Sequence, residues 1–298
     1  VEALNPGGSA KDRPARHMIE RALADGRLNP GDTVVESSSG NMGIGLAQAC
    51  AVHGLRFICV VDPNAQSQNV AIIRALGGQI ELVDHAPDGD FLAARLDRVA
   101  KLLEEDSRRF WPNQYANLDN PESHELGTIA EIDAALGGQI DALFVACSST
   151  GTARGCRDYL RRMGRKTKVV AVDAMGSTLF NGTAGPRKIS GMGAGRIPEL
   201  AKGQEFDDLV RVSDVTCVAG CRRAVAREGL LVGGSGGGVL EAVRGMQDEL
   251  AGLTVAAIIH DSGSRYLGTV FDPDWVEREL GICEADVTAL AGLAPADS

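Results

Sequence analysis

A single lysine stands near the start of the chain, between a tight turn and a helix. The stretch from Glu2 to Ala15 reads EALNPGGSAKDRPA, and its Asn-Pro-Gly-Gly sequence is typical of a turn. A helix is predicted from Asp12, with Pro14 in its first turn. Lys11 therefore lies at a fixed junction, where its amine could act as a nucleophile or a base if its surroundings lowered its pKa. A solvated surface lysine is the ordinary alternative.

Three further loops carry residue types that suit chemistry. The loop ESSSGNMGIG (Glu36 to Gly45) is either a strand-to-helix turn capped by serine or a glycine-rich nucleotide loop, although it lacks the GxGxxG spacing. The loop CSSTGTARG (Cys147 to Gly155) offers hydroxyls and backbone N–H groups that suit a phosphate. In LLVGGSGGGVLEAV, the glycines after Ser235 would let the backbone run against a flat ligand. Each loop, taken alone, is better explained as a structural feature than as a functional one.

Short apolar runs alternate with amphipathic stretches between these loops. Helical patterns cover Phe91 to Glu105 and Glu122 to Leu136. The apolar runs predict buried parallel strands at Thr33 to Ser37, Arg56 to Val61, Gln79 to Asp84, Ala142 to Cys147, Val169 to Ala174 and Val255 to Asp261. This alternation predicts an α/β fold with doubly wound sheets, in which ligands bind at the carboxyl ends of the strands.

Composition narrows the class of protein. The 298 residues are 44% hydrophobic, which is enough for a large core in one or two domains. The net charge is −10 and no basic stripe with interleaved aromatics is present, so nucleic acid is not an expected partner. No apolar run approaches the roughly 18 residues of a membrane span, and no signal-peptide pattern precedes the first turn. The seven cysteines are scattered without zinc-site spacing, so we expect a cytoplasmic protein with reduced thiols and no metal site.

In combination and in this order, the four loops resemble the cysteine synthase family of fold type II pyridoxal-phosphate enzymes. Three further stretches match that family: NQYANLDNPESHELGTIAEI from Asn113, GMGAGRIPEL from Gly191 and DSGSRYLGT from Asp261. The resemblance covers nearly the whole chain. It implies a tryptophan synthase β-like architecture and a homodimer. It also implies a smaller N-terminal α/β domain with a mobile part at residues 10–118, and a larger cofactor-binding α/β domain at 1–9 and 119–298.

The resemblance implies the residues that bind pyridoxal 5'-phosphate. Lys11 would bond the cofactor aldehyde, be displaced by substrate and then act as a base. Asn41 would hydrogen-bond the ring hydroxyl oxygen, and Ser235 would face the pyridine nitrogen. A serine cannot hold that nitrogen protonated as a carboxylate would, which suits β-elimination and replacement better than transamination. The phosphate would lie in a loop that has hydroxyls where the family is richer in glycine: Ser148, Ser149, Thr150, Gly151 and Thr152.

The resemblance also implies substrate-binding positions. Ser38, Ser39 and Gln114 match residues that grip the substrate carboxylate. The family commonly has threonine where this chain has Ser38 and Met42, which leaves the exact substrate open.

A phosphate on the substrate would need cationic or hydroxyl partners. Arg95 with Tyr115 and Ser148 is the favoured set, and Arg196 in GMGAGRIPEL is the other candidate cation. Arg95 lies in a charged helical stretch with Arg98, so a solvated helix face is the alternative for it.

Within the family, the chain is most similar to the siderophore-type branch. That branch joins O-phospho-L-serine and L-glutamate by β-replacement, giving N-(2-amino-2-carboxyethyl)-L-glutamate and phosphate on the way to 2,3-diaminopropionate. A transferase acting on small amino acids is thus expected. The first alternative is a cysteine synthase that uses O-acetylserine or O-phosphoserine with sulfide. A serine or threonine dehydratase, or a binding protein without catalysis, fits less well because Lys11 and every cofactor loop are present.

Overall fold

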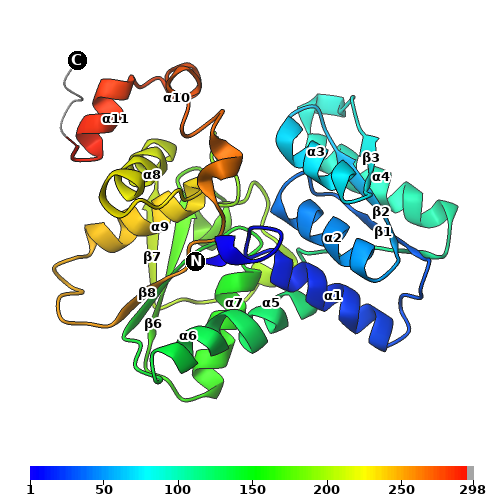
Figure 1. Cartoon of the computed structure of the whole chain (residues 1–298), viewed down its shortest axis with the longest axis horizontal. Coiled ribbons are helices and arrows are strands. Elements are labelled where there is room, and N and C mark those ends of the chain that lie inside the picture. The colour runs from blue at the N-terminus through cyan, green and yellow to red at the C-terminus, as the bar shows by residue number, and fades with distance from the viewer. Residues whose placement is uncertain (294–298) are drawn as a thin grey trace. The chain divides into compact units, whose positions relative to one another are not determined.

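The chain divides into two compact units in a computed structural model that describes residues 1–293 (Figure 1). The N-terminal unit consists of residues 5–120. The C-terminal unit consists of residues 1–4 and the chain from residue 121 onward. Each unit is built on its own four-stranded parallel sheet with helices on both faces, which confirms the predicted α/β class with doubly wound sheets.

The sheet of the N-terminal unit has the strand order β3-β2-β1-β4. Its strands are β1 (Thr33–Glu36), β2 (Arg56–Val61), β3 (Gln79–Leu82) and β4 (Arg109–Phe110). Its helices are α1 (Asp12–Ala24), α2 (Asn41–Val52), α3 (Ser67–Ala75) and α4 (Phe91–Glu105), with a 3-10 turn η2 (Pro87–Gly89) before α4. Because successive strand residues face opposite sides, Val34 packs with residues of α1 and α2, whereas Val35 packs with residues of α4.

The sheet of the C-terminal unit has the strand order β7-β6-β5-β8. Its strands are β5 (Ala142–Ala146), β6 (Lys168–Ala174), β7 (Asp208–Val212) and β8 (Val255–Ala257). Its α-helices are α5 (Asp119–Ser123), which begins in the N-terminal unit, α6 (Ile129–Ala135), α7 (Gly151–Arg162), α8 (Asp214–Glu228), α9 (Gly234–Gly245), α10 (Pro273–Leu280) and α11 (Glu284–Leu290). A π-helical turn η3 (His124–Thr128) joins α5 to α6, and the 3-10 turns are η1 (Glu2–Leu4), η4 (Leu179–Asn181), η5 (Glu199–Ala201) and η6 (Gly263–Tyr266).

Two core clusters cover the two faces of this second sheet. Phe144 packs on one face with residues of α8 and α9, and Leu143 packs on the other with residues of α6 and α7. The helix α8 begins where the Ser213 hydroxyl accepts a hydrogen bond from the Thr216 amide, and it ends at Gly229 in the left-handed conformation. Local capping residues therefore fix both ends of α8.

Two of the glycines that follow Ser235, Gly237 and Gly238, serve helix packing, and the expectation that this loop runs against a flat ligand stays a prediction. A Cβ atom at Gly237 would lie 2.3 Å from the carbonyl oxygen of Cys217 in α8, and one at Gly220 would lie 2.2 Å from the carbonyl oxygen of Gly237. At Gly238, a Cβ atom would lie 2.9 Å from the Cys217 sulfur. The missing side chains thus let α8 and α9 approach each other closely.

The sheet topology fixes where ligands can bind in each unit. Strand order reverses between β1 and β4 in the first sheet and between β5 and β8 in the second. In open parallel sheets, such reversals leave a crevice at the carboxyl ends of the strands. The loops that follow these strands contain Ser37 to Gly40 and Trp111 to Tyr115 in the first unit, and Cys147 to Thr150 and Ile258 to Asp261 in the second.

Several general features bear on function. Within residues 1–293, no helix has both the length and the apolar character needed to cross a bilayer. The same part of the chain contains no cluster of three or more His, Cys, Asp or Glu side chains arranged for a metal ion. All seven cysteines are free thiols, and Cys283 is the exposed one among them.

Candidate active site

Lys11 closes the turn that precedes α1. The Gly8 amide donates to the Asn5 carbonyl at 2.7 Å, and the Lys11 amide donates to the Ser9 hydroxyl at 3.2 Å. The side chain of Asp12 accepts a short hydrogen bond from the Gly7 amide. Lys11 then occupies the N-cap position of α1 and is half-buried. The turn thus fixes the backbone from which this side chain projects.

The helix α2 packs against the backbone of Lys11. A Cβ atom at Gly45 would lie 3.1 Å from the Lys11 carbonyl oxygen and 2.9 Å from the Cβ atom of Ala15. The glycine therefore permits close contact between the beginning of α1 and the second turn of α2. Asn41 is the first residue of α2 and is half-buried, so the same helix that contacts Lys11 also carries the candidate for the cofactor ring hydroxyl.

The loop between β1 and α2 folds over the helix N-terminus. The Ser38 hydroxyl accepts from the Gly43 amide at 3.3 Å, and the Ser38 carbonyl accepts from the Cys59 thiol at 2.8 Å. Ser38 and Ser39 are both half-buried. Because the first N–H groups of a helix have no intrahelical acceptor and carry partial positive charge, this arrangement suits a carboxylate.

A fully buried carboxyl group connects this region to the loop after β4. Glu36 has no exposed surface, and its Oε1 accepts from Trp111 Nε1 at 3.0 Å and from the Ser37 amide at 2.9 Å. Its Oε2 accepts from the Gln114 amide at 3.3 Å. Burial raises the pKa of Glu36, and the hydrogen bonds from Trp111 and the backbone amides oppose that shift. Glu36 thereby positions the backbone of Gln114, a substrate-binding candidate.

Arg95 and Tyr115, the favoured partners for a substrate phosphate, both belong to the N-terminal unit. Arg95 Nε lies 3.1 Å from Asp62 Oδ2, and the two side chains are only 16% and 10% exposed. Burial raises the pKa of the Tyr115 phenol, the charge of Glu36 raises it further and the charge of Arg95 lowers it. The ion pair with Asp62 and the minor contact with the Phe91 carbonyl at 3.4 Å both use Nε, so the terminal nitrogens of Arg95 keep N–H donors for an anion.

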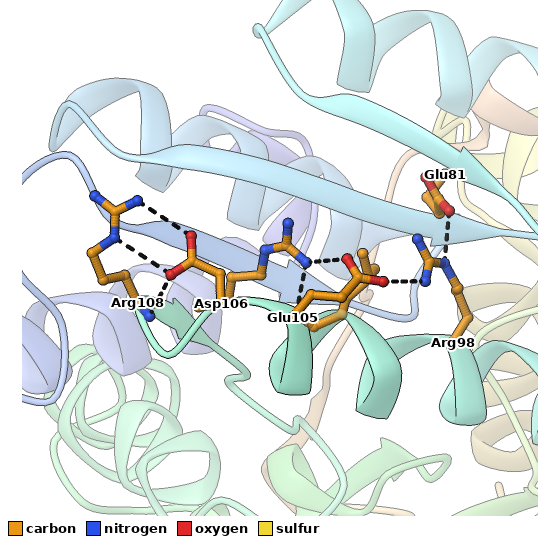
Figure 2. A network of polar contacts seen from close by, with 7 residues as sticks. Glu81, Arg98, Glu105, Asp106 and Arg108 are labelled. Carbon is orange, nitrogen blue, oxygen red and sulfur yellow. Dashed lines mark hydrogen bonds and ion pairs between the residues drawn. The ribbon is translucent and has the colours of Figure 1, made fainter.

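The neighbouring Arg98 differs from Arg95 in its partners. Figure 2 shows Arg98 between two carboxylates, with Nε 2.7 Å from Glu81 and Nη1 2.8 Å from Glu105. Glu105 also pairs with Arg109 at 2.8 Å. Arg98 therefore belongs to a partly exposed ion-pair network along α4. The alternative of a solvated helix face describes Arg98 and does not describe the largely buried Arg95.

The candidate phosphate loop lies at the beginning of α7. Thr150 adopts the left-handed conformation with φ 66°, which turns the chain from β5 into the helix, and Gly151 is the first helical residue. Ser149, Thr150 and Thr152 are all buried. Gln204 Nε2 donates a hydrogen bond to the Thr150 hydroxyl at 3.2 Å. Hydroxyl groups and unpaired first-turn amides at the end of a twelve-residue helix make a donor set that fits a phosphate.

Ser148 connects the phosphate loop to the GMGAG segment. Its hydroxyl donates to the Gly193 carbonyl at 3.0 Å, and the Gly193 amide donates to the Cys147 carbonyl at 2.7 Å. While that hydroxyl bond is formed, Ser148 can only accept a hydrogen bond from another group. Arg196, the other candidate cation, is exposed in the irregular segment of the C-terminal unit that follows Gly193.

Ser235 lies in the first turn of α9 and is buried. The preceding Gly233 donates its amide to the Asp261 carbonyl at 3.2 Å, and a Cβ atom there would lie 2.0 Å from Asp261 Oδ1. The Asp261 carboxylate in turn accepts from the Tyr266 hydroxyl at 2.5 Å. Burial and the negative charge of Asp261 raise the pKa of Tyr266, so this phenol stays a hydrogen-bond donor. These contacts hold the loop that presents Ser235.

The candidate site residues fall into two groups, each within one unit. Lys11 and the residues Ser38, Ser39, Asn41, Arg95, Gln114 and Tyr115 belong to the N-terminal unit, and Ser148 to Thr152, Arg196 and Ser235 belong to the C-terminal unit. Sequence reasoning missed two buried polar residues, Glu36 and His124, that support these two groups. His124 lies within the stretch already matched to the family, but a lone histidine in a helical pattern gives no sign of its partner.

Comparison with known proteins identifies the class of protein. Residues 1–261 match the model of the family described as pyridoxal-phosphate dependent enzyme. The chain belongs to this family, and its cofactor is pyridoxal 5'-phosphate.

The curated relatives are more specific. N-(2-amino-2-carboxyethyl)-L-glutamate synthase of Ralstonia nicotianae is 44% identical over 280 residues, which cover 93% of this chain and 83% of the relative. The enzyme of the same name from Cupriavidus metallidurans is 42% identical over 283 residues, with the same two coverages of 93% and 83%.

Solved structures show the same architecture. O-ureido-L-serine synthase superposes with a TM-score of 0.85 at 34% identity, covering 91% of this chain and 86% of that one. An O-acetylserine dependent cystathionine β-synthase from Helicobacter pylori gives a TM-score of 0.83 at 30% identity, with coverages of 90% and 87%. These results confirm the predicted membership among cysteine synthase-like fold type II enzymes.

Proposed function

We propose that this enzyme replaces the phosphate of O-phospho-L-serine with the amino group of L-glutamate. The bond from Cβ to the phosphate oxygen breaks, a bond from Cβ to the glutamate nitrogen forms, and the products are N-(2-amino-2-carboxyethyl)-L-glutamate and inorganic phosphate. The observation that carries this proposal is the name shared by two relatives at 44% and 42% identity over 93% of the chain. The solved structures with other names are more distant, at 30 to 34% identity.

The cofactor residues keep the roles that the resemblance implies. Pyridoxal 5'-phosphate, when bound, supplies an electron sink for the negative charge left at Cα. Lys11 would hold the cofactor aldehyde and, when substrate is bound, would take the proton from the substrate Cα and return it. Asn41 would hold the ring hydroxyl oxygen and Ser235 the ring nitrogen. The loop from Ser148 to Thr152 holds the cofactor phosphate, and its donor set supports that role.

The substrate residues have separate tasks. The N-terminus of α2, with Ser38 and Ser39, and the Gln114 segment orient the substrate carboxylate. Arg95 and Tyr115 bind the leaving phosphate, because a largely buried guanidinium can neutralise a dianion and a protonated phenol can donate a hydrogen bond to it. Ser148 joins this set as a hydrogen-bond donor once its hydroxyl is released from the Gly193 carbonyl. Loop closure in the mobile part of the N-terminal domain would exclude water from the reacting groups.

We also propose the setting of this reaction. The enzyme is a cytoplasmic homodimer, and its product supplies 2,3-diaminopropionate for siderophore biosynthesis. The names of the two relatives support the amino-acid product. Size-exclusion chromatography with light scattering measures the dimer, and a mass of one chain would refute it.

A cysteine synthase that uses sulfide is the second candidate. It is favoured by the likeness to a hydrogen sulfide-producing enzyme from Fusobacterium nucleatum, with a TM-score of 0.83 at 32% identity over 89% of this chain and 90% of that one. The O-acetylserine dependent enzyme from Helicobacter pylori also supports it.

One competition experiment separates the two candidates. The purified holoenzyme is incubated with O-phosphoserine and equal concentrations of glutamate and sulfide. Mass spectrometry identifies the amino-acid products, and the released phosphate is quantified. We expect the glutamate adduct in equal amount to the phosphate. Cysteine as the main product, with glutamate unused, would establish the sulfide reaction and refute the proposal.

A further inference from the structure

A buried histidine contacts the candidate phosphate loop from behind. His124 is the first residue of the π-helical turn η3, and none of its surface is exposed. Its Nε2 lies 3.2 Å from the hydroxyl of Thr152, in the first turn of α7, and its Nδ1 lies 2.9 Å from the hydroxyl of Thr128. The ring therefore connects a threonine of the phosphate loop to a threonine at the far end of the π turn. Such π turns occur frequently at functional sites.

The direction of these hydrogen bonds decides what Thr152 can offer to an anion. A neutral imidazole donates from one ring nitrogen and accepts at the other. If Nε2 carries the proton, it donates to the Thr152 oxygen, and Thr152 keeps its own proton for a phosphate oxygen. If Nδ1 carries the proton, Nε2 accepts the Thr152 proton, and Thr152 then turns only lone pairs toward the anion. Only the first tautomer makes Thr152 a phosphate donor.

The surrounding contacts keep the histidine in place. A Cβ atom at Gly155 of α7 would lie 2.9 Å from the His124 Cβ atom and 2.1 Å from the Pro121 carbonyl oxygen, so the π turn packs directly on α7. Arg162 of α7 pairs with Glu125 of the π turn at 2.8 Å. The ring therefore has a fixed position relative to the helix that carries Thr152.

We infer that His124 is a positioning residue for the cofactor phosphate: it donates from Nε2 to Thr152, accepts at Nδ1 from Thr128, and so directs the Thr152 proton to the phosphate. This inference rests on the proposed role of the loop from Ser148 to Thr152. It adds a residue that touches neither cofactor nor substrate and that acts only through Thr152. The cofactor affinity is then set partly by a proton position inside the protein.

Binding to the apoenzyme tests the inference without any measurement of activity. Pyridoxal 5'-phosphate is removed, and calorimetry measures the affinity of wild type and His124→Asn for pyridoxal 5'-phosphate, for inorganic phosphate and for pyridoxal, which lacks the phosphate. The shorter asparagine cannot place a donor where Nε2 lies. We expect about a tenfold loss in affinity for the two phosphate-bearing ligands, which corresponds to about 1.4 kcal/mol, and unchanged affinity for pyridoxal. His124→Gln, whose amide nitrogen can reach the Nε2 position, should restore most of the loss.

Two further measurements separate positioning from a merely structural role. In a Thr152→Ala background, His124→Asn should cause no additional loss of phosphate affinity. Nitrogen-15 NMR of the wild-type histidines, with His124 assigned by its absence in His124→Asn, should show a proton on Nε2. Thr128→Val keeps the ring while removing the donor to Nδ1, so it provides the test if His124→Asn does not fold, and it should lower phosphate affinity severalfold.

The outcomes distinguish this inference from the proposed function. An equal loss for pyridoxal and its phosphate, a loss that persists in Thr152→Ala, or a proton on Nδ1 would each overturn the role of His124. Unchanged phosphate affinity in Thr152→Ala alone would instead overturn the assignment of the phosphate loop.

Discussion

Replacing Glu36 by glutamine should disturb the Gln114 segment while leaving cofactor binding intact. The carboxyl group has two acceptor oxygens, which together serve Trp111, Ser37 and Gln114. Glutamine has one oxygen and one amide nitrogen, and the nitrogen is a donor. With the oxygen at the Oε1 position, the Gln114 amide faces another donor and loses its acceptor. The opposite orientation is worse, because Trp111 and the Ser37 amide then both lose theirs.

The magnitude follows from the better orientation. One buried donor without an acceptor costs about 1–3 kcal/mol, so Glu36→Gln should lower the free energy of unfolding by that amount at acidic pH. The wild-type carboxyl has its pKa raised above its ordinary value of 4.5 by burial. A raised folded pKa means that the native state binds the proton more tightly than the unfolded chain does. Wild-type stability from this group is therefore fully present below pH 4.5 and is lost as the pH rises through the folded pKa.

The assay is urea unfolding of both proteins at several pH values from about 4.5 to 8. The difference in the free energy of unfolding between wild type and Glu36→Gln should shrink as the pH rises, because the glutamine does not titrate. The KM for O-phosphoserine should increase several-fold, and the affinity for pyridoxal 5'-phosphate should stay the same. Trp111→Phe serves as the control, since it removes one donor and keeps the titrating carboxyl. A stability difference that is constant across the pH range would refute the account of Glu36 as a carboxyl disfavoured by burial.

Three other changes test separate parts of the structure. Lys11→Ala should abolish the borohydride-reducible bond to the cofactor, which mass spectrometry of the reduced protein detects; a remaining bond at the same site would remove Lys11 from its assigned role. Arg95→Ala should slow turnover of O-phosphoserine more than that of O-acetylserine, by about tenfold or more for a lost charge-assisted partner, whereas Arg98→Ala on the same helix should affect both alike. If the two arginine variants changed turnover of both substrates equally, Arg95 would have no specific role in binding the leaving phosphate. Gly237→Ala should destabilise the protein by about 1–3 kcal/mol through its 2.3 Å clash with a backbone carbonyl, and Gly245→Ala, with nothing within 4 Å, should stabilise it slightly in thermal unfolding.

The sequence was a good guide where one local pattern dominates. The apolar runs predicted the strands β1, β2, β3, β5, β6 and β8, and the pattern from Phe91 predicted α4 with its observed bounds. The family resemblance and the cofactor, which depend on several ordered motifs, are confirmed. The roles of Lys11, Asn41 and the phosphate loop stay predictions. The strands, α4 and the family motifs could be predicted because each depends on residues that are close together in the sequence.

The sequence did not predict elements that are very short, only partly buried or interrupted. β4 has only two residues, and β7 is half-buried along most of its length with charged side chains at Asp208 and Arg211, so neither reads as a buried apolar run. The predicted strand from Val255 ends at Ala257, because apolar residues continue past the last strand pairing. The stretch from Glu122 was predicted as one helix, and a π turn interrupts it. A π turn keeps the chain helical and differs from an α-helix in the spacing of its backbone hydrogen bonds, which the residue types alone do not reveal.

Glu36 and His124 explain why the candidate site was only partly predictable. Glu36 pairs with Trp111, which lies 75 positions later in the loop after β4. His124 pairs with Thr152, which lies 28 positions later in α7. A loop at the carboxyl end of a strand has few apolar contacts, so its orientation has to come from hydrogen bonds to buried polar groups behind it. Glu36 and His124 contact residues of the candidate site and influence ligand affinity by orienting those residues. Substitutions at these two positions should therefore alter ligand binding, which for Glu36 means the KM for O-phosphoserine, whereas Gly237→Ala should alter the free energy of unfolding alone.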